Sequence, residues 1–174
     1  DNTLNGGLGA DTLSGGAGSD IADYRERTTA LEIDLASGLN PDGDTFISIE
    51  GLSGGDAADA LSGDAANNRL YGFDGDDTLS GRAGNDTLSG GEGVDTLDGG
   101  AGVDVADYSD LTTDIVFDVA GGGSPAGDLL ISIEGLLAGS GDDDLRGDGA
   151  ANHLYGGGGD GTLAGAGGAG IPRG

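Results

Sequence analysis

The chain has 174 residues, 41 of them glycine, and its 32 acidic residues outnumber six basic ones to give a net charge of −26. Such acidity argues against nucleic-acid or anionic-membrane partners, and no run of 18 apolar residues predicts a membrane span. The lack of cysteine and the single histidine argue against zinc or copper sites.

The composition also predicts a thin core. Aromatic residues make up 4% of the chain, and much of the 35% hydrophobic fraction is alanine. Ordering a chain costs about 1.5 kcal/mol per residue, and glycine lies at the expensive end. Because like charges also repel on compaction, apolar burial alone is not expected to fold this chain.

Residues 1–23 carry a nine-residue repeat. The first five residues read as the tail of one unit, and GGLGADTLS and GGAGSDIAD follow. Each full unit opens with glycine, has an acid at its sixth place (Asp11 and Asp20) and an apolar residue at its eighth. Since the sequence begins inside a unit, we expect it to be an excerpt from a longer protein.

The repeat predicts a coil of short strands. Places seven to nine alternate polar, apolar, polar, which is typical of a strand with one buried face, and the glycine-rich first six places predict a turn. One such unit cannot bury its apolar face alone and must stack on copies of itself. Two units would make one coil, so equivalent residues recur every eighteen positions.

Residues 24–53 interrupt the rhythm. Leu31–Leu35 and Phe46–Glu50 alternate in polarity and predict two longer strands, and Asn40–Gly43 predicts the turn between them. The segment is too short for a core of its own. We therefore expect a wider loop of the same coil.

Residues 54–107 contain six units in tandem. Their sixth places alternate between two predicted edges, with Asp59, Asp77 and Asp95 on one and Asn68, Asp86 and Asp104 on the other. Carboxylates stacked roughly 5 Å apart would repel one another unless a cation lay between them. The turns offer only oxygen donors, which favours calcium over magnesium because calcium accepts six to eight oxygens in flexible geometry.

The same pattern then recurs. Residues 108–137 repeat the insertion at an offset of 84, so that Tyr108 matches Tyr24 and Glu134 matches Glu50. Residues 138–164 are degenerate units that keep Asp143 and Asn152 but have Gly161 where an acid is expected. Residues 165–174 have lost the motif, and we expect a frayed end or a cap there.

The units resemble the nonapeptide GGxGxDxUx of RTX, or hemolysin-type, calcium-binding repeats. This resemblance implies an all-β fold, a right-handed parallel β-roll of about 18 residues per turn with the two wider 30-residue insertions, forming one module over residues 1–174. It also implies several Ca²⁺ ions, each held between two turns mainly by backbone carbonyls.

The resemblance places these ligands on four pairs of turns and on four further sixth-place residues. The pairs are Gly55, Ala57 and Asp59 with Gly72, Asp74 and Asp77; Asp64, Ala66 and Asn68 with Gly81, Ala83 and Asp86; Phe73, Gly75 and Asp77 with Gly90, Glu92 and Asp95; and Arg82, Gly84 and Asp86 with Gly99, Ala101 and Asp104. The further candidates are Asp11, Asp20, Asp143 and Asn152.

Other acids leave alternatives open. The sixth-place acids could be solvated acidic turns instead of ligands. A second group could be either extra ligands around the insertions or surface charges flanking strands: Asp23, Asp44, Asp107, Asp128, Glu50 and Glu134.

The resemblance implies a secreted bacterial protein exported by a type I channel, in which a metal-free chain is disordered or expanded and calcium supplies the folding free energy. Exposed sites of this kind bind at roughly 0.1–1 mM, an extracellular concentration. With one histidine, His153, and no nucleophile-elbow pattern, we expect no catalytic site in this chain. The alternatives are an adhesin or surface-layer segment that binds a glycan or another surface partner through the face of the roll, and a module covalently linked to a catalytic domain.

Overall fold

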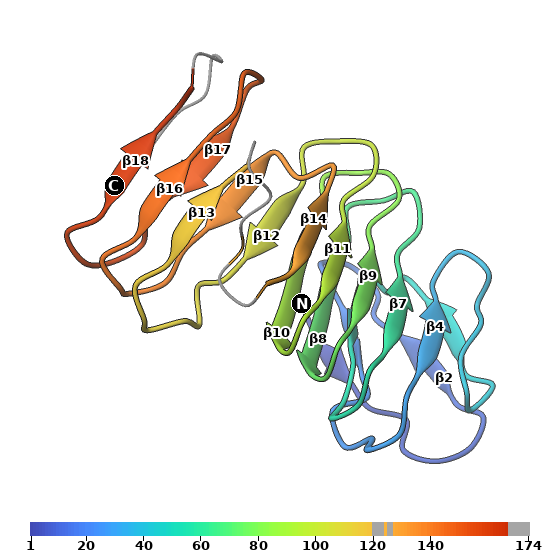
Figure 1. Cartoon of the computed structure of the whole chain (residues 1–174). Coiled ribbons are helices and arrows are strands. Elements are labelled where there is room, and N and C mark those ends of the chain that lie inside the picture. The colour runs from blue at the N-terminus through green and yellow to red at the C-terminus, as the bar shows by residue number, and fades with distance from the viewer. Residues whose placement is uncertain (120–123, 125–126, 167–174) are drawn as a thin grey trace.

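The computed structural model describes residues 1–119, 124 and 127–166. Every regular element in this part of the chain is a β-strand, and the strands of successive turns stack side by side from the blue amino-terminal end to the red carboxy-terminal end (Figure 1). All the strand pairs are parallel, as a β-roll requires. No helix in the described ranges is long and apolar enough to cross a membrane.

One face of the roll is an unbroken eight-stranded sheet. Neighbouring strands of the repeats are offset by eighteen residues, so that Leu88 lies opposite Leu70 and Ala106. In stacking order the strands are β1 (Thr3–Leu4), β3 (Ile21–Asp23), β6 (Gly51–Ser53), β8 (Arg69–Asp74), β10 (Thr87–Glu92), β12 (Val105–Asp107), β15 (Gly135–Leu137) and β17 (His153–Tyr155).

The opposite face is divided into three sheets. The first pairs β2 (Thr12–Ser14) with β5 (Thr45–Ile47), and the third is β13 (Val116–Asp118), β16 (Asp144–Arg146) and β18 (Thr162–Ala164). The second runs β14 (Leu129–Ile131), β11 (Thr96–Asp98), β9 (Thr78–Ser80), β7 (Ala60–Ser62) and β4 (Glu32–Asp34).

The two insertions cause these divisions. In the first insertion β4 pairs with β7 of the following turn, whereas β5 pairs with β2 of the preceding turn. The second insertion does the same, since β13 pairs with β16 and β14 with β11. The first face continues through both insertions.

The strand predicted over Phe46–Glu50 was wrong in its second half. The strand covers Thr45–Ile47, and Ser48 has a left-handed φ of 51° that ends it. Ser132 has the same φ at the matching position of the second insertion. Residues 48–50 consequently form a tight turn, and Glu50 lies directly before β6.

The core is a column of eighth-place side chains. Leu70, Leu79, Leu88 and Leu97 are fully buried between the two faces, and Ala106 continues the column. Tyr24 and Tyr108 add the bulk of an aromatic ring at the insertions. Side chains from both faces therefore form one core along the repeats.

Candidate metal centre

Hydrogen bonds connect the sixth-place residues of successive turns. The N–H of Asp59 donates to Oδ1 of Asp77 at 2.7 Å, and the N–H of Asp77 donates to Oδ1 of Asp95 at 2.8 Å. On the other edge the N–H of Asn68 donates to Asp86 at 2.7 Å and that of Asp86 to Asp104 at 2.8 Å. One oxygen of each carboxylate is thus used to hold the preceding turn, on the two edges that the eighteen-residue period predicts.

The second oxygen of these carboxylates, Oδ2, differs from the first in its hydrogen bonding. In six of them Oδ2 is buried and has no hydrogen-bond partner among the described residues, although the side chains are at most 1% exposed. Burying a carboxylate oxygen unpaired is costly unless a cation compensates for it. The six are Asp20, Asp77, Asp86, Asp95, Asp104 and Asp143.

The first-place glycine keeps the space beside that oxygen open. A Cβ on Gly72 would overlap both Oδ2 of Asp77 and the carbonyl oxygen of Gly90 in the next turn. A Cβ on Gly81 would in the same way collide with Oδ2 of Asp86 and approach the carbonyl of Gly99. The unpaired oxygens of Asp77 and Asp86 therefore each share a small gap with a carbonyl of the following turn, which is an arrangement that suits a hard cation.

The electrostatics of these sites disfavour negative charge without a cation. Burial, with smaller contributions from the carboxylates of Asp95 and Asp59, raises the pKa of Asp77 to about 6. Burial likewise raises the pKa of Asp86 to about 6, with a contribution from Asp104. The pKa values of Asp95 and Asp104 are raised for the same reason. A bound divalent ion would reverse this penalty.

The donors available are mostly backbone oxygens. Among the described residues, no three or more Asp, Glu, His or Cys side chains gather into a metal-binding group. The gaps beside Asp77 and Asp86 instead bring a carboxylate oxygen next to a carbonyl of the following turn. The carbonyls of Glu92 and Ala101 accept hydrogen bonds from the N–H groups of Gly75 and Gly84, and each retains a second lone pair.

The family model of the RTX calcium-binding nonapeptide repeat matches four stretches of the chain, residues 1–24, 53–88, 71–106 and 137–171. The chain belongs to this family. No curated protein matches the chain. The family is a structural calcium-binding repeat and not a catalytic one, so this RTX roll binds several Ca²⁺ ions.

Three units of the RTX roll depart from this geometry. In them the sixth-place side chain accepts the N–H of place two in its own turn: Gly55 to Asp59 at 2.8 Å, Asp64 to Asn68 at 2.8 Å, and Asp148 to Asn152 at 2.9 Å. These side chains are buried, but the hydrogen bond already uses the oxygen that faces the gap. The structure thus separates the residues into self-bonded and unpaired classes, a difference that the shared motif alone did not predict.

Place four carries the signal for this difference. Gly75 and Gly84 have φ of 125° and 123°, a left-handed conformation that glycine adopts readily. The self-bonded units have alanine there instead, Ala57, Ala66 and Ala150. Because alanine resists that conformation, these turns follow another path that points the place-two N–H at the sixth side chain.

Two place-two residues have positive φ without being glycine, Phe73 at 79° and Arg82 at 72°. Their side chains make compensating contacts. Arg82 donates to both carboxylate oxygens of Asp34 at 2.8 and 2.7 Å, and Phe73 lies 5.7 Å from the guanidinium of Arg25. These side-chain contacts hold the two strained turns in place.

The remaining candidates differ in completeness. Asp11 is half-buried, and its own N–H donates to Asp44 at 2.8 Å. Asp143 accepts the N–H of Ile115 at 3.1 Å, and the turn that follows offers Gly161 where an acid is expected. Asp143 is consequently an acid with an unpaired oxygen but no sixth-place carboxylate above it.

Sequence reasoning left the role of the insertion acids undecided. Asp44 and Asp128 are buried, which excludes a surface-charge role. Each stands directly before a strand, accepts the N–H of a sixth-place acid (Asp11 or Asp95), and also accepts a tyrosine hydroxyl. By contrast, Asp23 forms an ion pair with Arg25 at 2.8 Å.

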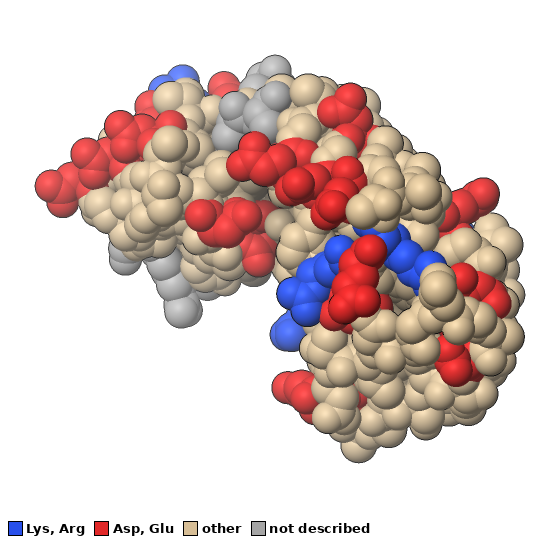
Figure 2. Space-filling model, turned by 90° about the horizontal axis from the view of Figure 1, so that it is seen from below, with Lys and Arg blue, Asp and Glu red and all other residues tan. Residues whose placement is uncertain are grey.

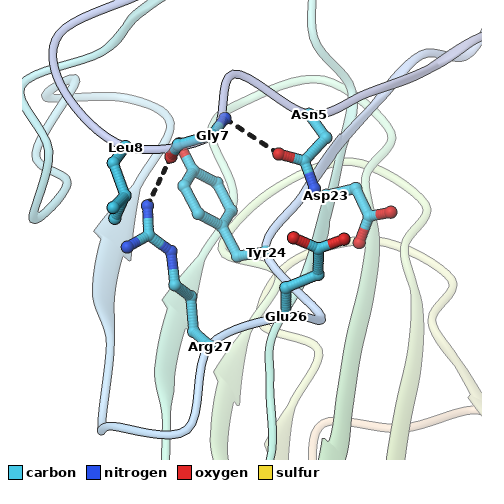
Figure 3. A pocket seen from close by; sticks show the side chains of 7 residues that line it. All are labelled: Asn5, Gly7, Leu8, Asp23, Tyr24, Glu26 and Arg27. Atoms are coloured by element: carbon cyan, nitrogen blue, oxygen red, sulfur yellow. Dashed lines mark hydrogen bonds between the residues drawn. The ribbon is translucent and has the colours of Figure 1, made fainter.

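A surface pocket lies where the first insertion meets the amino-terminal turn (Figure 3). In it Arg27 points toward Gly7 and donates to its carbonyl, while the Gly7 N–H donates to Oδ1 of Asn5 at 2.9 Å. The described residues that line it include carboxylates and an arginine but no serine, cysteine or histidine: Asn5, Gly7, Leu8, Asp23, Tyr24, Glu26 and Arg27. We interpret it as a seam between two turns.

Proposed function

We propose that this RTX roll is a calcium-triggered folding module of a larger secreted bacterial protein, exported by a type I channel as its repeat family implies. The chain stays expanded at cytosolic calcium and folds on meeting extracellular calcium, which assists its export and stabilises the protein outside the cell. The activity of the larger protein resides in a covalently linked domain outside this sequence.

The observation that carries this proposal is the set of six buried, unpaired carboxylate oxygens. Without cations they place like charges about one strand spacing apart along two edges, in a chain of net charge −26. Figure 2 shows acidic side chains spread over both halves of one face, whereas the basic ones gather mainly in one patch. The negative charge is thus only locally compensated by arginine.

We infer that the ligands follow the family pattern with unequal strength. The pairs built on Asp77 with Asp95 and on Asp86 with Asp104 have unpaired oxygens in both turns, which supports the tighter sites. The pairs that begin with Asp59 and Asn68 have one self-bonded member each, which supports weaker ones.

We also infer that residues 1–164 act as one module. The repeats of residues 1–23, 54–107 and 138–164 share the continuous eight-stranded face, and the insertions 24–53 and 108–137 each contribute a strand to it. Of the expected end or cap at residues 165–174, residues 167–174 lie outside the described residues.

Small-angle X-ray scattering on the whole chain tests the folding step. In EDTA we expect a radius of gyration close to that of an unfolded chain of this length, roughly 44 Å, and a marked contraction at millimolar calcium. Equal values under both conditions would contradict the proposal. Export is tested separately by secreting the full-length protein into media with and without calcium, where we expect less exported protein without calcium and protease resistance only with calcium. Equal export in both media would contradict the proposed assistance.

A further inference from the structure

Two turns outside the nonapeptide pattern reproduce the gap seen between regular units. A Cβ on Gly99 would overlap the carbonyl oxygen of Ser132 and the side chain of Asp104. A Cβ on Gly15 would overlap the carbonyl of Ser48 and the side chain of Asp20 in the same manner. The serine carbonyl thus takes the position that the carbonyl of Gly90 and its equivalents occupies in the repeats.

The carboxylates in these two gaps are unpaired. Asp20 and Asp104 are both fully buried, and Oδ2 of each has no hydrogen-bond partner among the described residues. Oδ1 of Asp104 already accepts the N–H of Asp86 at 2.8 Å. The unpaired oxygen therefore belongs to a buried side chain that meets the serine carbonyl beside the first-place glycine.

A glutamate replaces the sixth-place aspartate of the upper turn. The N–H of Asp104 donates to Oε2 of Glu134 at 3.0 Å, and the N–H of Asp20 donates to Oε2 of Glu50 at 3.0 Å. These turns contain three residues, 132–134 and 48–50, where a regular unit has six. The extra methylene of glutamate lets its carboxylate accept the equivalent N–H group from a shorter turn.

We propose that each insertion ends in an additional Ca²⁺ site, formed by Asp104, the Ser132 carbonyl and Glu134 in one copy and by Asp20, the Ser48 carbonyl and Glu50 in the other. Two carboxylates and a carbonyl suit a hard, oxygen-seeking divalent cation. Ser132 and Ser48 are exposed and the glutamates half-buried, so water can complete the coordination. These sites rest on calcium binding by the chain, and they extend the row of calcium sites beyond the nonapeptide pairs.

The test is the number of calcium ions bound by the whole chain, measured by equilibrium dialysis with metal analysis at saturating calcium. We expect Glu134→Gln to lose one ion and the double variant Glu50→Gln/Glu134→Gln to lose two. Glutamine keeps an oxygen that can accept the N–H of Asp104, so the hydrogen bond between the two turns is retained. The matched control Glu32→Gln removes the same charge from an exposed strand position and should lose none.

An unchanged count in the double variant would overturn the two sites while leaving calcium binding by the repeats intact. A wild-type chain that bound no calcium would instead contradict the calcium binding on which the sites rest. If the double variant failed to fold in calcium, wild-type crystals grown in calcium would decide. An anomalous peak between Asp104 and the Ser132 carbonyl would support the site, and its absence beside clear peaks at the repeat pairs would overturn it.

Discussion

Asp77 and Asp95, eighteen residues apart, are joined by a hydrogen bond of 2.8 Å from the N–H of Asp77 to Oδ1 of Asp95. The same two carboxylates each keep a buried Oδ2 without a partner. One oxygen of the carboxylate therefore binds the preceding turn, and the other is left free for a cation. Coil stacking and metal binding depend on the same side chains, which is why folding and calcium are expected to be coupled.

Replacing Asp77 with alanine should raise the calcium concentration at the folding midpoint more than replacing Asp143 with alanine. Each substitution leaves one backbone N–H without its acceptor, that of Asp59 or of Ile115, which lowers the stability of the fold by about 1–3 kcal/mol. Asp77 would additionally serve two ions, whereas Asp143 faces Gly161 above it. Circular dichroism during calcium titration gives both midpoints, and equal shifts would argue against shared ions.

Gly81→Ala should weaken calcium binding and folding, because its Cβ would overlap Oδ2 of Asp86 and crowd the carbonyl of Gly99. The matched control is Gly149→Ala, since a Cβ on Gly149 meets nothing within 4 Å. We expect a loss of bound calcium only for Gly81→Ala, measured by calorimetry. A normal ion count in this variant would show that the gap is not the binding position.

Tyr108→Phe should destabilise the calcium-loaded roll by about 1–3 kcal/mol. The Tyr108 hydroxyl donates to Oδ2 of the buried Asp128 at 2.7 Å, and burial with this bond raises the pKa of Tyr108. Tyr71→Phe, on the half-buried outward face, should change urea unfolding much less. Equal effects of the two substitutions would remove the special role of the insertion tyrosine.

Mild acid should partly replace calcium in the chelated protein. Because the folded-state pKa values of Asp77 and Asp86 are raised to about 6 from 3.8, the folded state binds protons more tightly than the unfolded chain. The stability of the metal-free fold therefore increases as pH falls below about 6 and is lost as pH rises through that value. Circular dichroism in EDTA should show more strand at about pH 5 than at pH 7, and the reverse order would contradict the burial of these acids.

The repeat part of the fold could be predicted because its period fixes each residue's neighbour. Leu70 must stack on Leu88, and Asp77 on Asp95, once the coil contains eighteen residues. The insertions break that rule, so the sequence did not show that β4 and β5 would pair with opposite turns. Asp128 accepts the N–H of Asp95 across a separation of 33 residues, a spacing that no periodicity indicates.

The inequality of the sites was hidden for a different reason. Asp59 and Asp77 occupy the same place of the motif, yet only Asp59 is bonded to its own turn. The difference arises from Ala57 against Gly75 two places earlier, through the φ that each residue adopts. In this pair of units the backbone conformation two places away therefore separates a self-bonded carboxylate from an available one, and a motif read residue by residue does not include that coupling.

The most direct test is a crystal structure of this chain grown in calcium, with anomalous data to locate the ions. We predict an ion beside Oδ2 of Asp77 and the carbonyl of Gly90, and another beside Oδ2 of Asp86 and the carbonyl of Gly99. Sixth-place carboxylates turned out to solvent, with no ion between successive turns, would contradict the account.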